Sequence, residues 1–231
     1  MKVKEDSTEK KTMAGEDATR DLIRELGLLS TGTDFESDIQ YINIIGSVEG
    51  HSVLPADNKA TKYEHLIPQL IAVEENPKLK GLLVILNTVG GDVEAGLALA
   101  EMISTLSKPT VSLVLGGGHS IGIPLAVAAD YSFITKTATM TLHPIRTTGL
   151  VITSETTFDY MRKTQERVIS FIDEHSRAGR EKIIKLMNAN DNMSNDVGTI
   201  LFGNEAVEAG IIDEIGGLSQ ALAELRRRID K

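Results

Sequence analysis

Apolar residues gather in short runs, and glycine-rich turns or amphipathic stretches separate these runs from one another. Short, unbroken apolar runs are typical of strands that are buried on both faces of a parallel sheet. The pattern predicts strands over 39–45, 82–86, 110–115, 131–135 and 139–143. The intervening stretches predict helices over 64–75, 92–106 and 120–129. This alternation predicts an α/β fold with a largely parallel sheet and right-handed crossovers.

In the last third of the chain the pattern changes to the spacing of a long helix. Phe158, Val168 and Ile172 belong to its apolar face, and charged residues cover much of the remainder. Such a helix can project and pair with its counterpart in another subunit, or it can lie on its own domain. A polar turn segment over 188–196 follows, and a narrow apolar stripe predicts a C-terminal helix over 218–229.

The first 36 residues are expected to form an arm separate from a single domain over 37–231. The arm is rich in charged residues and has no aromatic residue before Phe35, a composition that does not support a packed core. An amphipathic stretch over 18–29 predicts a short helix within this flexible arm. We expect no secretory signal, because neither an apolar h-region nor a small-residue cleavage site is present.

The composition narrows the choice of partners. The chain has 24 Lys and Arg against 33 Asp and Glu, a net charge of −9. An acidic chain without a basic stripe disfavours nucleic acid and anionic lipid as partners. The chain has no cysteine, which excludes disulfides and thiolate metal sites and agrees with the cytoplasmic location that we expect.

One stretch, between Lys108 and Asp130, carries no charge and is long enough to cross a membrane. Its three consecutive glycines, two serines and Pro124 would make a poor lipid-facing helix. A strand, a turn and a helix account for all of these residues. We therefore expect no integral membrane segment.

The most informative motif runs from Gly116 to Pro124 and has Ser120 at its centre. Consecutive glycines allow a sharp turn between the preceding strand and the following helix. A hydroxyl on the first turn of a helix lies beside unpaired backbone N–H groups, which favour developing negative charge. The motif therefore favours a nucleophilic serine, and the alternative is an ordinary turn in which the serine caps the helix.

A serine nucleophile requires a base, and His143 is the best candidate among the five histidines. It ends an alternating run that predicts a strand, and Pro144 stops the ladder there. The end of a strand can meet an adjacent turn in an α/β layer. His119 is the weaker candidate, because successive residues at a turn usually point apart.

A second glycine-rich turn, over 87–92, follows the predicted strand at 82–86. It can supply an oxyanion hole, with one backbone N–H from Gly91 and another from Ile121. The alternative is a tight turn that binds no ligand. A phosphate loop is disfavoured, because the G-K-[ST] ending of that motif is absent.

Together these residues resemble the Clp-type serine peptidases, the ClpP family. The resemblance covers about 39–215 and lies in the order and spacing of six short motifs. These are Ile45–Glu49, Glu75–Pro77, Asn87–Gly91, Gly116–Ser120, Leu142–Pro144 and Glu205–Asp213. The resemblance implies a ClpP/crotonase-like fold of repeated ββα units, with the long helix as a protruding handle that joins two rings.

Carried over residue by residue, the resemblance makes Ser120 the nucleophile and His143 the base, with Gly91 and Ile121 as the oxyanion donors. The third triad member does not align, because the family's aspartate falls at Gly198. We expect Asp196 to replace it, and Asp191 or no carboxylate at all are the alternatives.

The resemblance implies a serine endopeptidase that hydrolyses peptides or unfolded proteins inside a homo-oligomeric ring, with an AAA+ ATPase unfoldase as a partner and with no metal or organic cofactor. The insertion over 51–62 is most similar to the translocation-enhancing, TepA-like branch, which implies a link to secretion or signal-peptide turnover.

Two rival functions remain open. An inactive scaffold is suggested by the missing aspartate and by His119, which stands where the family normally has a small residue. A crotonase-like acyl-CoA enzyme would share the fold and the oxyanion site, but it would use carboxylates in place of Ser120 and His143.

Overall fold

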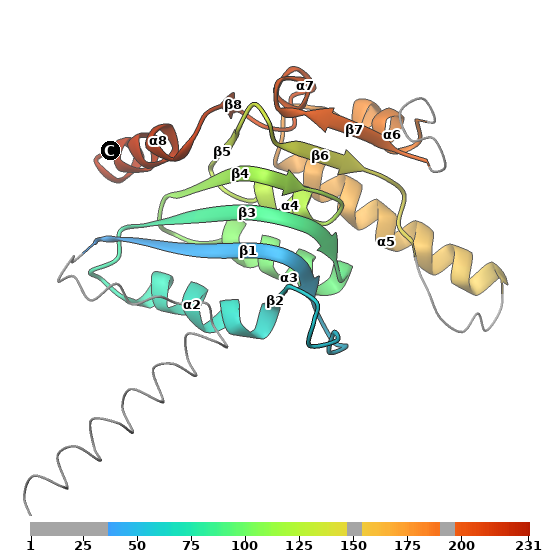
Figure 1. The fold of residues 1–231 in the computed structure, drawn as a ribbon, viewed down its shortest axis with the longest axis horizontal. Coiled ribbons are helices and arrows are strands. Elements are labelled where there is room, and N and C mark those ends of the chain that lie inside the picture. Colours follow the sequence, from blue (N-terminus) through green and yellow to red (C-terminus); the bar gives the residue numbers. More distant parts are fainter. Residues whose placement is uncertain (1–36, 147–153, 190–196) are drawn as a thin grey trace, which may run out of the picture. The chain divides into compact units, whose positions relative to one another are not determined.

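The computed structural model describes residues 37–146, 154–189 and 197–231 (Figure 1). The predicted arm over 1–36 lies outside the described residues. So do Asp191 and Asp196, the two aspartates considered for the triad. None of the helices in the described ranges is long and apolar enough to cross a membrane.

The strands of the described part form one eight-stranded sheet with the order β2-β1-β3-β4-β5-β8, and β6 joins β4 to β7. Every pair of neighbouring strands is parallel except β6 and β7, which confirms the largely parallel sheet. The strands are β1 (Ile39–Glu49), β2 (Ala60–Lys62), β3 (Gly81–Gly91), β4 (Thr110–Gly118), β5 (Tyr131–Ile134), β6 (Thr139–Leu142), β7 (Thr199–Phe202) and β8 (Glu214–Ile215).

Strands and helices are interspersed along the described parts of the chain, which confirms the α/β organisation. The helices are α2 (Tyr63–Glu75), α3 (Val93–Ser104), α4 (Gly122–Val127), α5 (Ser154–Glu174), α6 (Arg180–Met187), α7 (Gly203–Glu208) and α8 (Leu218–Ile229). Asp92 caps α3, because its carboxylate accepts a hydrogen bond of 2.9 Å from the Ala95 N–H. Five short elements, namely β2, α6, β7, α7 and β8, were not predicted.

The apolar runs are unbroken because both faces of the central strands are covered. In β3, Leu82 and Leu86 face the main core, which includes residues of α2 and α3. Leu83, which points to the opposite face, belongs to a second cluster with Leu225 of α8. Each of these leucines has no more than 2% of its surface exposed. Burial on two faces therefore explains why this strand lacks polar alternation.

The long helix α5 is buried along only part of its length. Val168 and Ile172 pack in the main core, whereas Phe158 and Tyr160, nearer its start, are 67% and 60% exposed. In Figure 1 one end of this helix extends beyond the sheet. The first half of α5 therefore presents aromatic side chains that its own domain does not cover.

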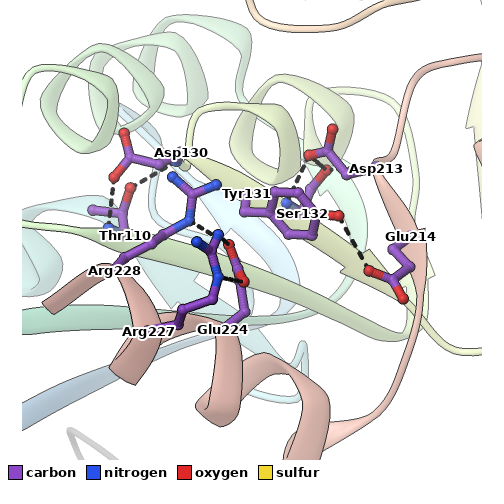
Figure 2. Close-up of polar contacts among 9 residues, drawn as sticks. All are labelled: Thr110, Asp130, Tyr131, Ser132, Asp213, Glu214, Glu224, Arg227 and Arg228. Atoms are coloured by element: carbon purple, nitrogen blue, oxygen red, sulfur yellow. Dashed lines mark hydrogen bonds and ion pairs between the residues drawn. The ribbon is translucent and has the colours of Figure 1, made fainter. Parts of the chain in front are cut away.

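Polar contacts fix the edge of the sheet near α8 (Figure 2). The buried Ser132 of β5 donates from its N–H and its hydroxyl to one carboxylate oxygen of Asp213, at 2.9 and 2.8 Å. The Asp213 N–H donates back to the Ser132 hydroxyl oxygen at 3.0 Å. Thr110 and Asp130 form a similar reciprocal pair between the starts of β4 and β5.

We expect Asp213→Ala to lower the free energy of unfolding by about 2–4 kcal/mol, because Ser132 would lose a charged acceptor while remaining buried. Urea denaturation of the variant measures this change. Asp230→Ala, at an exposed position after α8, is the control and should change the value by less than about 0.5 kcal/mol. Equal effects of the two substitutions would contradict the structural role of Asp213.

Candidate active site

Ser120 lies at the apex of the turn between β4 and α4. Its backbone φ is 56°, the one positive value for a residue other than glycine in the described ranges. Such a conformation costs about 1–3 kcal/mol and is maintained only where neighbouring structure enforces it. Here the Ser120 N–H donates to the Thr141 carbonyl oxygen at 2.8 Å, and the His119 N–H donates to the Thr88 carbonyl oxygen at 3.1 Å. The predicted sharp turn is therefore held by β3 and β6.

The two glycine-rich turns pack against each other. A methyl group at Gly90 would lie 2.7 Å from the Ser120 Cβ atom, and one at Gly122 would lie 2.7 Å from a methyl carbon of Thr88. Larger side chains at these positions would force the turns apart. Because these two glycines have no side chain, the turn after β3 can pack closely against the turn that carries Ser120.

Four of the five predicted site residues line one cavity. Ser120, Ile121, Gly91 and His143 surround a volume of about 160 Å³. Apolar side chains of several helices complete much of the wall, including Val93, Ile123, Val168, Ile172 and Met187. The fifth predicted residue, Asp196, lies outside the described residues and is not placed.

The two predicted oxyanion donors lie at element ends. Gly91 is the last residue of β3, and a methyl group there would lie 2.3 Å from the Val48 carbonyl oxygen, so the chain requires glycine. Ile121 directly precedes α4, and among the described residues its N–H has no acceptor. An unpaired N–H at the start of a helix is available to a ligand oxygen.

His143 directly follows β6 and is half-buried. Its Nδ1 atom lies 2.7 Å from the carbonyl oxygen of Pro144. A carbonyl oxygen can only accept, so Nδ1 is the donor in this contact, and the tautomer that fits it has its lone pair at Nε2. Within the described part of the chain, no direct hydrogen bond joins His143 to Ser120. The contact between a nucleophile and its base is often loose before substrate binds.

His119 contacts β6 through its ring. Its Nδ1 atom lies 2.8 Å from the Thr141 hydroxyl oxygen, and the ring covers Gly117, where a methyl group would lie 2.7 Å from Nε2. Burial lowers the pKa of His119, and repulsion by the protonated form of His143 lowers it further. His119 is therefore neutral at pH 7, and its ring is held by Thr141 beside the turn.

The lowered pKa of His119 predicts acid destabilisation. In the unfolded chain this imidazole binds a proton below about pH 6.5, whereas the folded protein resists protonation until lower pH. The unfolded state therefore binds more protons in that window, and stability falls as the pH drops through it. We expect the loss of unfolding free energy between about pH 7.5 and pH 5 to be smaller in His119→Gln than in the wild type.

Urea denaturation at both pH values measures this difference, with His65→Gln on α2 as the matched control. An identical pH dependence in His119→Gln and the wild type would contradict the effect of burial on His119.

The residues that support the turn carrying Ser120 were not predicted from the sequence. Thr88 and Thr141 contact the turn through main-chain oxygens or a hydroxyl, and Gly90 contributes only its small size. Thr88 lies within the motif Asn87–Gly91, but its contact with the turn was not predicted, and Thr141 lies outside the six motifs. A usable signal is the position of Thr141 two residues before His143, because residues two apart on a strand share a face.

The fold is that of ClpP. The chain is similar to the solved structure of a mutant of ClpP1 from Listeria monocytogenes, with a TM-score of 0.64. The match covers 79% of this chain and 94% of that one, at 22% sequence identity. This likeness confirms the predicted fold class.

The sequence model described as Clp protease matches residues 37–218, and the chain therefore belongs to the Clp protease family. The translocation-enhancing protein TepA of Halalkalibacterium halodurans is 56% identical over 209 residues, which cover 90% of this chain and 82% of that protein. The ATP-dependent Clp protease proteolytic subunit 1 of Chlamydia muridarum is 29% identical over 140 residues, 58% of this chain and 69% of that protein. The predicted resemblance to the ClpP family, and to its TepA-like branch, is confirmed.

Proposed function

We propose that this protein is a serine endopeptidase of the Clp type that hydrolyses peptides or unfolded proteins. Ser120 is the nucleophile, His143 is its base, and the N–H groups of Gly91 and Ile121 hold the oxyanion. The observation that carries this proposal is the presence of all four residues on one cavity. They come from the ends of three different strands and the start of α4, far apart along the chain.

In the proposed reaction the Ser120 Oγ atom attacks the peptide carbonyl carbon while its proton passes to Nε2 of His143. The tetrahedral oxyanion accepts hydrogen bonds from the two backbone donors. The C–N bond then breaks as Nε2 returns the proton to the leaving amine, and water hydrolyses the acyl ester on Ser120 with His143 again as the base. Val168 and Ile172 of α5 give the cavity an apolar wall, and electrostatic interactions are stronger in apolar surroundings than in water.

We further propose that the active form is a homo-oligomeric ring in the cytoplasm, served by an AAA+ ATPase unfoldase. The exposed aromatic residues Phe158 and Tyr160 on α5 support a contact between subunits at this helix. We also propose a role linked to protein secretion or signal-peptide turnover, and the words translocation-enhancing in the name of the TepA relative support a link to translocation. Asp196, the residue expected as the third triad member, lies outside the described residues.

The test of this function is hydrolysis of fluorogenic peptides by the full chain, with its assembly measured by native mass spectrometry. Acyl-CoA thioesters are assayed in parallel. We expect cleavage of peptides by the assembled protein and no turnover of acyl-CoA. Turnover of acyl-CoA without peptide cleavage would favour the crotonase-like alternative, and an assembled protein inactive on both would favour the scaffold.

A further inference from the structure

The position opposite His143 on the neighbouring strand has no side chain. β6 and β7 are antiparallel, with Leu142 opposite Thr199, so the next position along this register sets His143 against Gly198. A methyl group at Gly198 would lie 2.9 Å from the His143 Cβ atom. Alignment on the Glu205–Asp213 motif puts the family's triad aspartate at this same position. The structure thus places residue 198 beside the Cα and Cβ atoms of His143, at the position that the alignment gives to the triad aspartate.

The backbone at Gly198 is also built in a way that excludes an aspartate. Its φ is 140°, a region that other residues rarely adopt, and a methyl group there would lie 2.4 Å from the Leu142 carbonyl oxygen. The Gly198 N–H donates to the Ala189 carbonyl oxygen at 2.7 Å, which holds the segment in place. A carboxylate at 198 would therefore require the backbone of both strands to move.

An alternative acceptor already occupies the nitrogen that a triad carboxylate would bind. The Nδ1–H of His143 donates to the Pro144 carbonyl oxygen at 2.7 Å, a normal hydrogen-bond length. Proline fixes its own φ and restricts the preceding residue to extended conformations. The short segment from His143 to the Pro144 carbonyl is therefore stiffer than an ordinary loop, and its oxygen is well suited to fix a ring.

We propose that the Pro144 main-chain carbonyl takes the place of the triad carboxylate, so that Ser120 and His143 work as a dyad oriented by the backbone. This inference rests on the proposed function of the site. The carbonyl holds the proton on Nδ1 and leaves Nε2 free to accept the Ser120 proton. In known triads, loss of this tautomer control costs about 10⁴ in kcat. The carbonyl supplies tautomer control without a carboxylate, although a neutral acceptor stabilises the imidazolium less than an anion does.

The first test removes the two aspartates that could supply a carboxylate. The full-chain Asp191→Asn/Asp196→Asn variant is treated with a fluorophosphonate, and the rate constant of labelling at Ser120 is compared with the wild type. We expect the two rates to agree within about tenfold, whereas an essential carboxylate predicts a loss of about 10⁴. A larger fall than tenfold, in a variant with unchanged native mass and melting temperature, would overturn the inference.

If the double variant does not fold, Asp191→Asn and Asp196→Asn are measured separately. Each single variant must then stay within the same limit, and a larger loss in either folded variant would overturn the inference. Failure of the proposed function is distinguishable, because the wild type itself would then show no labelling at Ser120.

The second test makes the backbone around the Pro144 carbonyl more flexible. Pro144→Gly frees the backbone that presents this oxygen, and Pro77→Gly, in the turn before β3, is the matched control. We expect Pro144→Gly to lower the maximal inactivation rate by the fluorophosphonate at least about tenfold with little change in its half-saturating concentration, since the imidazole is less well oriented. An unchanged maximal rate in this variant would overturn the inference.

Discussion

Ser120→Ala is expected to lower kcat/KM for peptide hydrolysis by a factor of at least about 10⁴, because no covalent acyl intermediate can form without the hydroxyl. Binding and the oxyanion donors remain, so a small residual rate above the uncatalysed reaction should persist. The φ of 56° at this position is compatible with alanine only at some cost in stability, and the melting temperature must therefore be measured as well.

The control for Ser120→Ala is a substitution of a serine that does not line the cavity. Ser107 is exposed in the turn before β4, and Ser107→Ala should leave kcat/KM within about twofold of the wild type. A folded Ser120→Ala variant that retained more than about a tenth of wild-type activity would contradict the assignment of the nucleophile.

His143→Ala is expected to lower kcat by a comparable factor of about 10⁴ or more, with a much smaller change in KM. The imidazole moves protons in the transition state, and the remaining wall of the cavity still binds the substrate. Because the two residues act as a unit, the Ser120→Ala/His143→Ala variant should lose little more than Ser120→Ala alone. Steady-state kinetics of the three variants on one peptide measure this non-additivity.

His119→Ala is the control for this prediction, because its ring contacts Thr141 beside the same turn but is not assigned a proton transfer. It should lose far less kcat than His143→Ala. A larger loss at His119 than at His143, or additive losses for Ser120 and His143, would contradict the assignment of His143 as the base.

The central strands were predictable because burial on both faces of the sheet leaves a continuous apolar run. Leu82 to Leu86 is such a run, and its strand was predicted at nearly the observed start. The same strand continues through Asn87 to Gly91, where the polar and glycine residues predict only a turn. That extension comes from pairing with β1, a long-range contact that no local pattern specifies.

The short elements near the site were missed for a related reason. β7 has four residues and forms by pairing with β6, and the Thr199 hydroxyl donates to the Leu186 carbonyl oxygen at 2.6 Å. Four residues are too few to show the alternation of apolar and polar residues that marks a strand. Without β7, the sequence could not show that Gly198 lies opposite His143.

Motifs indicated the residues that we propose as nucleophile, base and oxyanion donors, because each lies next to a glycine, a proline or a strand end with a recognisable pattern. No motif indicated the Pro144 oxygen as the acceptor for the His143 ring. This oxygen belongs to the main chain, and every residue has a main-chain carbonyl oxygen. Its role depends on a distance, which only the structure provides.

Activation of Ser120 by His143 over the shared cavity is the step on which the proposed peptidase function depends. The most direct measurement is peptide mapping by mass spectrometry after reaction of the full-length protein with a fluorophosphonate. We predict one phosphonyl adduct, on the peptide that contains Ser120, and no adduct there in His143→Ala over the same time. An adduct on another residue alone, or equal labelling of Ser120 with and without the imidazole, would contradict the account.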